Sequence, residues 1–211
     1  MDEIQDKLNQ NKETSVLNEV WQWIKAILAA IVIALLIRGF IFEPVLVDGP
    51  SMEPTLFTGE KLILYKLGSF FRSPEKGDIV VVEINQGKFA FFKFLNKSDF
   101  AKKVLPTFIK EVDYIKRVIA VEGDVIDIKE GYVYINGEKI EEDYLLQQGA
   151  TYIRTDAITF PYKVKVGEII VLGDNRVNSR DSRELGPLPV SAVKGKAVFR
   201  IWPFDVIGKL E

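Results

Sequence analysis

The 211-residue chain is long enough for one domain carrying an insertion, and its composition, 47% hydrophobic and 27% charged, is that of a globular protein. A formal net charge of −2 gives no electrostatic basis for binding nucleic acid. The sequence has no histidine and no cysteine, which excludes a Ser-His-Asp triad, a cysteine nucleophile and a Cys/His zinc site. A nucleophilic hydrolase with this composition needs serine or threonine and a base other than imidazole, for which lysine is the obvious candidate.

The N-terminal residues predict a polar tail followed by a membrane anchor. Residues 1–19 are polar and mixed in charge, which indicates a short flexible tail. The strictly apolar run 26–37 is shorter than the ~20 residues that a span needs, but the window 20–42 is long enough. Trp21 lies where an interfacial aromatic belt would be, and Lys25 can extend toward the headgroups. We therefore expect a single transmembrane helix over residues 20–42, with a buried core helix as the alternative.

The distribution of lysine and arginine around this segment indicates its orientation. Lys7, Lys12 and Lys25 lie on its N-terminal side, whereas only Arg38 precedes Lys61 on the other side. Positive residues are enriched in cytoplasmic segments. We expect a cytoplasmic N-terminus and an extracytoplasmic body at the cell membrane.

Beyond Phe42 the sequence predicts a mainly β body with antiparallel sheets, because no long helical period appears. Asn136-Gly137 is a strong signature of a two-residue hairpin turn. The stretch 89–110 mixes phenylalanines with lysines, and we expect an edge hairpin or a peripheral loop there, with contact to the membrane surface as the alternative. The β-branched or aromatic runs that predict strands are 62–65, 79–83, 114–121, 125–128, 132–135, 168–172 and 196–201.

The stretch around Ser51 is the first that could support chemistry. Pro50 and Pro54 flank this serine, so the backbone is stiff and the direction of the hydroxyl is well defined. A nucleophile benefits from such preorganisation. A rigid loop without chemistry is the alternative for this stretch taken alone.

Lys116 lies in the predicted strand 114–121. Two-residue alternation places Tyr114, Lys116, Val118 and Ala120 on one face. Among such neighbours an ammonium loses hydration, which lowers a lysine pKa from about 10.4 and lets the amine act as a general base near neutral pH. The alternative is a lysine at a strand edge with its amine in water.

The stretch 173–183 follows the apolar strand 168–172 and alternates acidic residues with arginines. A solvated turn is one interpretation. The density of groups able to form bidentate pairs also predicts an ordered network of ion pairs and hydroxyls that could hold a lysine amine in place.

These stretches, in this order, resemble the successive sequence boxes of bacterial type I signal peptidases. They read G-P-S-M-E-P-T-L (49–56), D-Y-I-K-R-V-I-A-V-E-G-D (113–124) and G-D-N-R-V-N-S-R-D-S-R (173–183), and 195–203 is similar to the final strand of that family. The resemblance covers nearly the whole chain from the anchor onward. It also accounts for the absence of histidine.

The resemblance implies a role for each matching residue. Ser51 would be the acylated nucleophile and Lys116 the general base. The supporting residues would be Ser179, which orients the lysine amine, and Asp174, Arg176, Asp181 and Arg183. Gly49 stands where some members carry a serine whose hydroxyl stabilises the oxyanion, so the second oxyanion donor is left open.

The resemblance also implies the substrates and the architecture. The substrates would be exported preproteins, cut after a signal peptide with small residues at the first and third positions before the scissile bond. The fold would be a β catalytic core, 43–121 and 166–211, with a smaller β insertion at 122–165. We expect a lipid bilayer as partner, and no nucleic acid, metal or cofactor. The residues expected to line the substrate pockets are Val47, Asp48, Gly49, Met52, Leu56, Tyr114 and Ile115.

Other classes fit less well. SOS-repressor-type autoproteases share the serine–lysine logic but carry a DNA-binding head where this chain has an apolar segment. The S-x-x-K spacing at Ser73 and Ser191 lies in turn or strand contexts without a K-T-G partner, unlike penicillin-recognising enzymes. A catalytically silent, membrane-tethered β-module that binds peptides or assists assembly is the remaining alternative. The presence of both Ser51 and Lys116 favours the enzyme.

Overall fold

In the computed structural model of this protein, the residues described are 19–34, 37, 41–67, 72–84 and 112–210. The stretch 89–110, expected as an edge hairpin or loop, lies outside them. The elements after residue 41 are β1 (Phe42–Leu46), β2 (Lys61–Tyr65), β3 (Ile79–Ile84), β4 (Val112–Val121), β5 (Val125–Lys129), β6 (Tyr132–Ile135), β7 (Glu138–Lys139), β8 (Tyr162–Lys163), β9 (Glu168–Leu172), α5 (Ser182–Leu185), β10 (Leu188–Pro189), η1 (Val190–Ala192), β11 (Val193–Trp202), η2 (Phe204–Val206) and β12 (Gly208–Lys209).

Residues up to 41 and residues 42–211 form two compact units. In the first unit, residues 19–34 are helical and their large apolar side chains, including Trp21 and Trp23, are exposed. No helix within the described ranges has both the length and the apolar character needed to cross a membrane. The expected anchor over 20–42 thus stays a prediction. Phe42, the last residue of that expected range, begins β1 instead.

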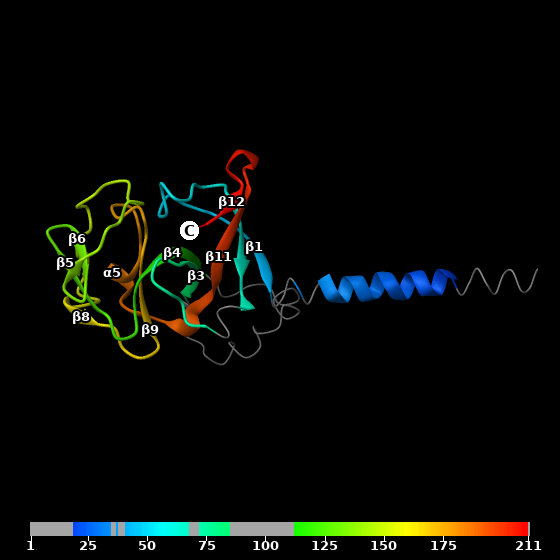
Figure 1. The fold of residues 1–211 in the computed structure, drawn as a ribbon, viewed down its shortest axis with the longest axis horizontal. Coiled ribbons are helices and arrows are strands. Elements are labelled where there is room, and N and C mark those ends of the chain that lie inside the picture. Colours follow the sequence, from blue (N-terminus) through cyan, green and yellow to red (C-terminus); the bar gives the residue numbers. More distant parts are fainter. Residues whose placement is uncertain (1–18, 35–36, 38–40, 68–71, 85–111, 211) are drawn as a thin grey trace, which may run out of the picture. The chain divides into compact units, whose positions relative to one another are not determined.

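The second unit is mainly β, as expected, and its strands pair antiparallel (Figure 1). Its described residues form an eight-stranded sheet in the order β1-β2-β11-β3-β4-β9-β10, with β12 paired to β11. β4 therefore lies inside the sheet, between β3 and β9, and a side chain on it can be withdrawn from water. After Glu168, the residues Ile169–Leu172 of β9 are apolar on both faces and buried.

A second, four-stranded sheet has the order β7-β6-β5-β8 and falls within the residues expected as an insertion, 122–165. The predicted turn at Asn136-Gly137 joins β6 to β7, and both residues have positive φ, 55° and 88°. One hydrophobic cluster connects the two sheets, with Ile126 and Val133 from the small sheet packed among Ala120 and Ile170 from the large one. The small sheet is thereby fixed beside β4 and β9.

Candidate active site

Ser51 lies in the turn segment that follows β1. The buried side chains of Met52 and Leu56 hold this segment in a hydrophobic cluster, and the Leu56 N–H donates to the Met52 carbonyl at 2.9 Å. Asn175 fixes the backbone from the other side, because its N–H donates to the Ser51 carbonyl at 3.1 Å and its Nδ2 to the Pro50 carbonyl at 3.2 Å. The serine is thus attached to the loop that follows β9.

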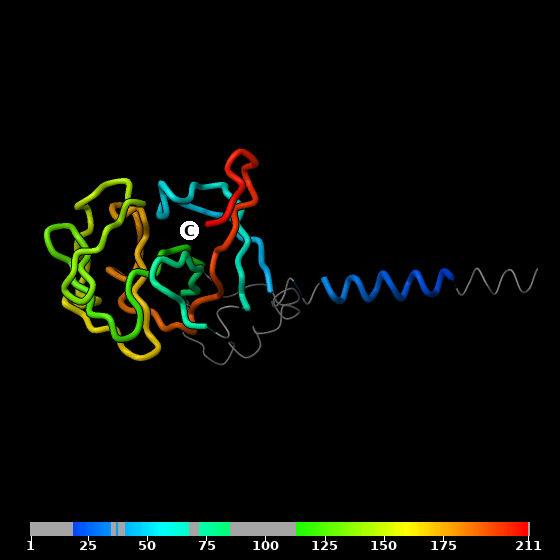
Figure 2. Tube along the Cα trace, in the orientation of Figure 1, coloured from blue at the N-terminus to red at the C-terminus, as the bar shows by residue number. Residues whose placement is uncertain are grey.

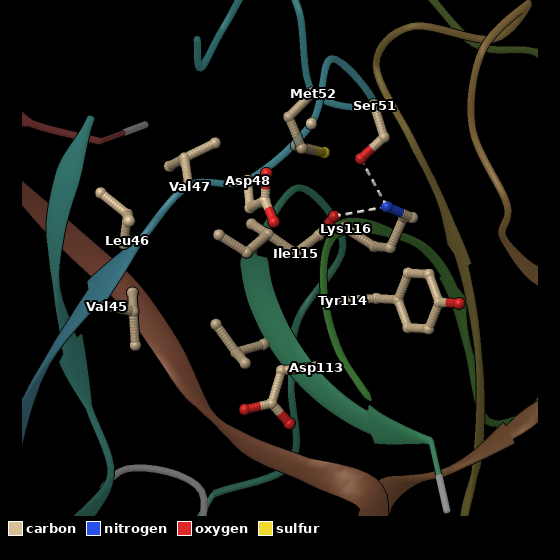
Figure 3. A pocket seen from close by; sticks show the side chains of 12 residues that line it. Val45, Leu46, Val47, Asp48, Ser51, Met52, Asp113, Tyr114, Ile115 and Lys116 are labelled. Carbon is tan, nitrogen blue, oxygen red and sulfur yellow. Dashed lines mark hydrogen bonds between the residues drawn. The ribbon is translucent and has the colours of Figure 1, made fainter. Parts of the chain in front are cut away.

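Lys116 projects from β4 toward this serine. Its Nζ donates to Ser51 Oγ at 2.7 Å and to the Ile115 carbonyl oxygen at 2.7 Å (Figure 3). Only 1% of the residue is exposed. Burial lowers the pKa of Lys116 to about 8, while the nearby carboxylates of Asp181 and Asp174 oppose this by favouring the ammonium. A lysine with this pKa supplies a useful fraction of neutral amine in mildly alkaline solution.

Asp181 forms a bidentate pair with Arg183. Arg183 Nε and Nη2 donate to the two carboxylate oxygens at 2.9 and 2.8 Å, and the Gly173 N–H adds a bond at 3.0 Å. Burial by itself would raise the Asp181 pKa, but the Arg183 guanidinium and the Gly173 N–H hold this pKa below its usual range. The carboxylate stays ionised and caps the start of α5.

Asp174 pairs with Arg117, the residue after Lys116. Arg117 Nε and Nη2 donate to its two oxygens at 3.0 and 2.8 Å, and Thr55 Oγ1 donates to Oδ2 at 2.5 Å. Asp174 therefore connects the strand of the lysine with the turn of the serine. The charges nearest Lys116 are consequently compensated by arginines.

Arg176 points away from this pair toward the inserted segment. Its guanidinium pairs with Glu142, its Nη1 donates to Thr151 Oγ1 at 2.6 Å, and its Nε donates to the Gly173 carbonyl at 3.0 Å. Arg176 and Asp174, both expected among the supporting residues, thus take different ion-pair partners.

Ser179 is buried close to the site, but its role stays a prediction. Lys116 Nζ has its described bonds to Ser51 and Ile115, and the Ser179 hydroxyl has no well-formed hydrogen bond to a described residue. The hydroxyl is near enough to Asp181 to contribute to the low pKa of that carboxyl.

A cavity of about 220 Å³ lies beside Ser51 and Lys116, between the end of β1 and strand β4 (Figure 3). The predicted pocket residues that line it are Val47, Asp48, Gly49, Met52, Tyr114 and Ile115. Leu56 does not, because it is fully buried in the core cluster with Val47 and Met52. Gly49 has a φ of 96°, and a Cβ built on it would meet no atom within 4 Å. The space that a serine side chain would need there is therefore open.

Sequence reasoning did not single out four residues of the network, namely Thr55, Arg117, Glu142 and Tyr144. The Tyr144 ring stacks 4.1 Å from the Arg117 guanidinium, and its hydroxyl donates to Glu142 Oε1 at 2.8 Å. Burial and the Glu142 carboxylate raise the pKa of Tyr144, which stays neutral. Alternation on β4 could have indicated Arg117, because it faces away from Lys116 and needs its own anion. Nothing in the local sequence distinguishes Glu142 from neighbouring acidic residues.

Residues 20–202 match the family described as "Signal peptidase, peptidase S26". A signal peptidase I of Bacillus licheniformis is 36% identical over 97% of this chain and 100% of the relative. Signal peptidase IB of Staphylococcus aureus is 34% identical over 89% of this chain and 92% of the relative. A crystal structure of a signal peptidase I from Enterococcus faecalis is 23% identical and covers 59% of this chain and 97% of its own, with a TM-score of 0.43.

Proposed function

This chain belongs to the signal peptidase family, peptidase S26, and we propose that it is a serine endopeptidase that removes signal peptides from exported preproteins. The observation that supports the mechanism most directly is a buried lysine amine, with a pKa lowered to about 8, that lies 2.7 Å from a serine hydroxyl beside a small cavity. With no histidine in the chain, this pair is the base and nucleophile that the proposal uses.

In the proposed acylation step, the neutral Lys116 amine accepts the Ser51 hydroxyl proton while Oγ attacks the scissile carbonyl carbon. The tetrahedral intermediate collapses when the Lys116 ammonium returns that proton to the departing amide nitrogen, which leaves an ester on Ser51. Lys116 then takes a proton from water, the hydroxide attacks the ester, and the proton returns to Ser51 Oγ. The Ser51 backbone N–H is the proposed first donor to the oxyanion.

The cavity supports a preference for small side chains before the scissile bond. It is smaller than pockets that hold drug-sized ligands, and its lining combines apolar side chains such as Val45, Val47 and Ile115 with polar ones. An extended substrate lying along these strands would place alternate side chains in it. We propose cleavage after an A-x-A-like sequence.

The proposal includes attachment to the cell membrane through residues 20–42, with a cytoplasmic N-terminus and the catalytic unit outside. Its support is the apolar window with its lysine bias, together with the exposed apolar side chains of the helical residues 19–34. Such a tether would hold the site beside the bilayer that contains the substrate's signal peptide.

The test is cleavage of a purified preprotein with an A-x-A site in detergent or liposomes. We expect wild type to cut after the second alanine. Ser51→Ala and Lys116→Ala should each lower activity at least a thousandfold, because no other group replaces the proposed nucleophile or the proposed base. Ser191→Ala is the control, since Ser191 is exposed in η1 and stands in an S-x-x-K spacing.

Each contrary result has a distinct meaning. A wild type that binds the preprotein without cutting it would overturn the enzyme and favour the silent β-module. Cleavage that survives Lys116→Ala would overturn the choice of base, and cleavage lost in Ser191→Ala would overturn the choice of nucleophile.

A further inference from the structure

Arg154, in the irregular segment between β7 and β8, holds three backbone carbonyls of the loop that follows β9. Its Nη1 donates to the Ser179 carbonyl at 2.8 Å, and its Nη2 donates to the carbonyl of Arg176 at 2.8 Å and to that of Val177. Figure 2 shows the yellow segment between β6 and β8 and the orange segment before α5 passing beside each other. One planar guanidinium from the inserted segment thus fixes the conformation of residues 176–179.

This loop holds Ser179 against the backbone of the nucleophile. A Cβ on Gly173 would overlap the Ser179 hydroxyl and would lie 2.5 Å from the Ser51 carbonyl oxygen, so both residues pack on the same side of Gly173. The Asn175 N–H bonds to that same Ser51 carbonyl at 3.1 Å. A displacement of residues 176–179 would therefore change the position of Ser179 relative to Ser51 and to Lys116, which is bonded to Ser51.

The chemistry of the contact requires arginine. Guanidinium nitrogens in a rigid plane can donate to three carbonyls at once, whereas a lysine ammonium is a compact point charge that does not reproduce this geometry. Only 27% of the Arg154 side chain is exposed, so its bonds are partly shielded from water. If any other residue replaced Arg154, the three carbonyl oxygens would lose this shared donor.

We infer that Arg154 is a positioning residue for the acyl-transfer reaction, which acts by holding Ser179 in register with Ser51 and Lys116. This inference rests on the proposed function. The inserted segment accordingly contributes to the rate of the reaction as well as to folding, although Arg154 contacts neither the cavity nor the reacting atoms.

The chain offers a matched control in Arg180. Both arginines pair with Glu184, Arg154 at 3.2 Å and Arg180 at 3.6 Å, but among the described contacts only Arg154 reaches the loop carbonyls. Arg180→Ala thus removes the same charge beside the same carboxylate. Glu184→Gln removes the ion pair of Arg154 and leaves its carbonyl bonds.

The first measurement is kcat and KM for preprotein cleavage by the full chain in detergent. We expect Arg154→Ala and Arg154→Lys to lower kcat about tenfold with KM unchanged, because misplaced catalytic groups slow the bound substrate's reaction. Arg180→Ala and Glu184→Gln should stay within about twofold of wild type. A kcat of Arg154→Ala equal to that of Arg180→Ala would overturn the inference.

The second measurement distinguishes positioning from general stabilisation. In a Ser179→Ala background, measured under single-turnover conditions, Arg154→Ala should cost less than about twofold, because the group it positions is gone. The acid limb of the kcat/KM pH profile should shift in the same direction in Arg154→Ala and in Ser179→Ala, and should stay in place in Arg180→Ala. An equal fold-loss in both backgrounds contradicts the inference.

Thermal unfolding of each variant is measured alongside its activity. If Arg154→Ala does not fold, the kinetics and the pH profile of Arg154→Lys test the inference instead. A wild type that does not cleave would overturn the proposed function itself. A wild type that cleaves, alongside fully active Arg154 variants, would overturn only the positioning role.

Discussion

Lys116 combines two properties that oppose each other, a charge-bearing side chain and almost complete burial. The amine has only Ser51 Oγ and the Ile115 carbonyl as its described hydrogen-bond partners, and its nearest carboxylates, Asp174 and Asp181, are each already paired with an arginine. Burial therefore prevails over the attraction of those carboxylates and lowers the Lys116 pKa to about 8. Burying this amine, the proposed base, therefore costs folding free energy locally.

The first consequence concerns the pH dependence of the rate. The base acts only when neutral, so kcat/KM should rise with pH, reach half its limit near pH 8 and then level off. At pH 7 about one enzyme molecule in ten would carry the neutral amine. A pH series on one preprotein checks this, and a rate that is flat from pH 6 to 9 would contradict the assignment of Lys116 as the base.

The second consequence concerns stability. The folded-state pKa of Lys116, about 8, lies below the ordinary value of 10.5. Between these two pH values the unfolded chain binds more protons than the folded chain, so the free energy of unfolding increases as pH rises from 8 to 10.5. Below pH 8 the burial cost is on the order of 3 kcal/mol. Lys116→Met should thus unfold at a higher temperature than wild type at pH 7.5, although the loss of the lysine's hydrogen bonds reduces this gain. Melting curves at pH 7.5 and 10 should show a smaller difference in Tm between variant and wild type at pH 10, and a constant difference in Tm would refute the burial cost.

Gly173 provides a third test at single-residue resolution. Gly173→Ala forces a methyl group into the space of the Ser179 hydroxyl and within 2.5 Å of the Ser51 carbonyl oxygen, so we expect activity to fall at least a hundredfold. Gly208→Ala is the matched control, because a Cβ there meets nothing within 4 Å. Preprotein cleavage and circular dichroism on both variants check this, and a fully active Gly173→Ala would show that the loop is not packed as described.

At the scale of elements, the sequence predicts most strands of four or more residues and misses the two-residue strands. The runs 132–135 and 168–172 coincide with β6 and β9, because β-branched or aromatic residues fill them. The two-residue strands β7, β8, β10 and β12 are too short to show alternation. The expected strands do not include β1, whose first residue, Phe42, is the last residue of the expected anchor. The face predicted for β4 also changes along the strand, since the register shifts between Val118 and Ala120.

The predicted site shows the same limit. Ser51 and Lys116 could be proposed from the absence of histidine in the whole sequence and from the sequence boxes around each residue. The Arg117–Asp174 and Glu142–Arg176 pairs join residues 57 and 34 positions apart. The pairing of β4 with β9 brings the first two together, and the return of the inserted segment to the loop after β9 brings the second two together. Alternation predicts which face a side chain takes, but not what lies opposite it.

The Glu142–Arg176 pair yields a prediction at this scale. Glu142→Ala leaves the Arg176 guanidinium, whose side chain is 1% exposed, without its carboxylate, and we expect a loss of about 3 to 5 kcal/mol in the free energy of unfolding. Glu184→Ala removes two partly exposed pairs, with Arg154 and Arg180, and should cost less than about 1 kcal/mol. Urea unfolding of both variants measures the difference, and equal losses would contradict the structural importance of the buried pair.

At the scale of the whole molecule, both sheets, the cavity and the network belong to the unit that begins at residue 42. Three hydrophobic clusters lie within this unit, and one of them joins the two sheets. None of the helical residues 19–34 belongs to these clusters. The catalytic chemistry and the proposed tether are thus separable in sequence.

A fragment of residues 42–211 should therefore fold and cut a short soluble peptide containing A-x-A with a kcat/KM within about threefold of the full chain. We expect it to cut a preprotein embedded in liposomes less efficiently, because the tether would no longer raise the local concentration of substrate. The two assays, run with the full chain as reference, check this. An unfolded fragment would show that the first 41 residues are needed for the core.

The order of the large sheet also determines how much of the chain the site needs. β11 follows β9 and β10 in the chain but lies between β2 and β3, and contacts to Thr55 come from Asp174 and Arg200, which are 119 and 145 residues away in sequence. A partly synthesised chain without β11 lacks the strand that joins β1–β2 to β3–β4, and with it one of the links between the turn of Ser51 and the strand of Lys116. During synthesis, the proposed nucleophile and base are therefore expected to reach their full arrangement only in a chain that extends through β11.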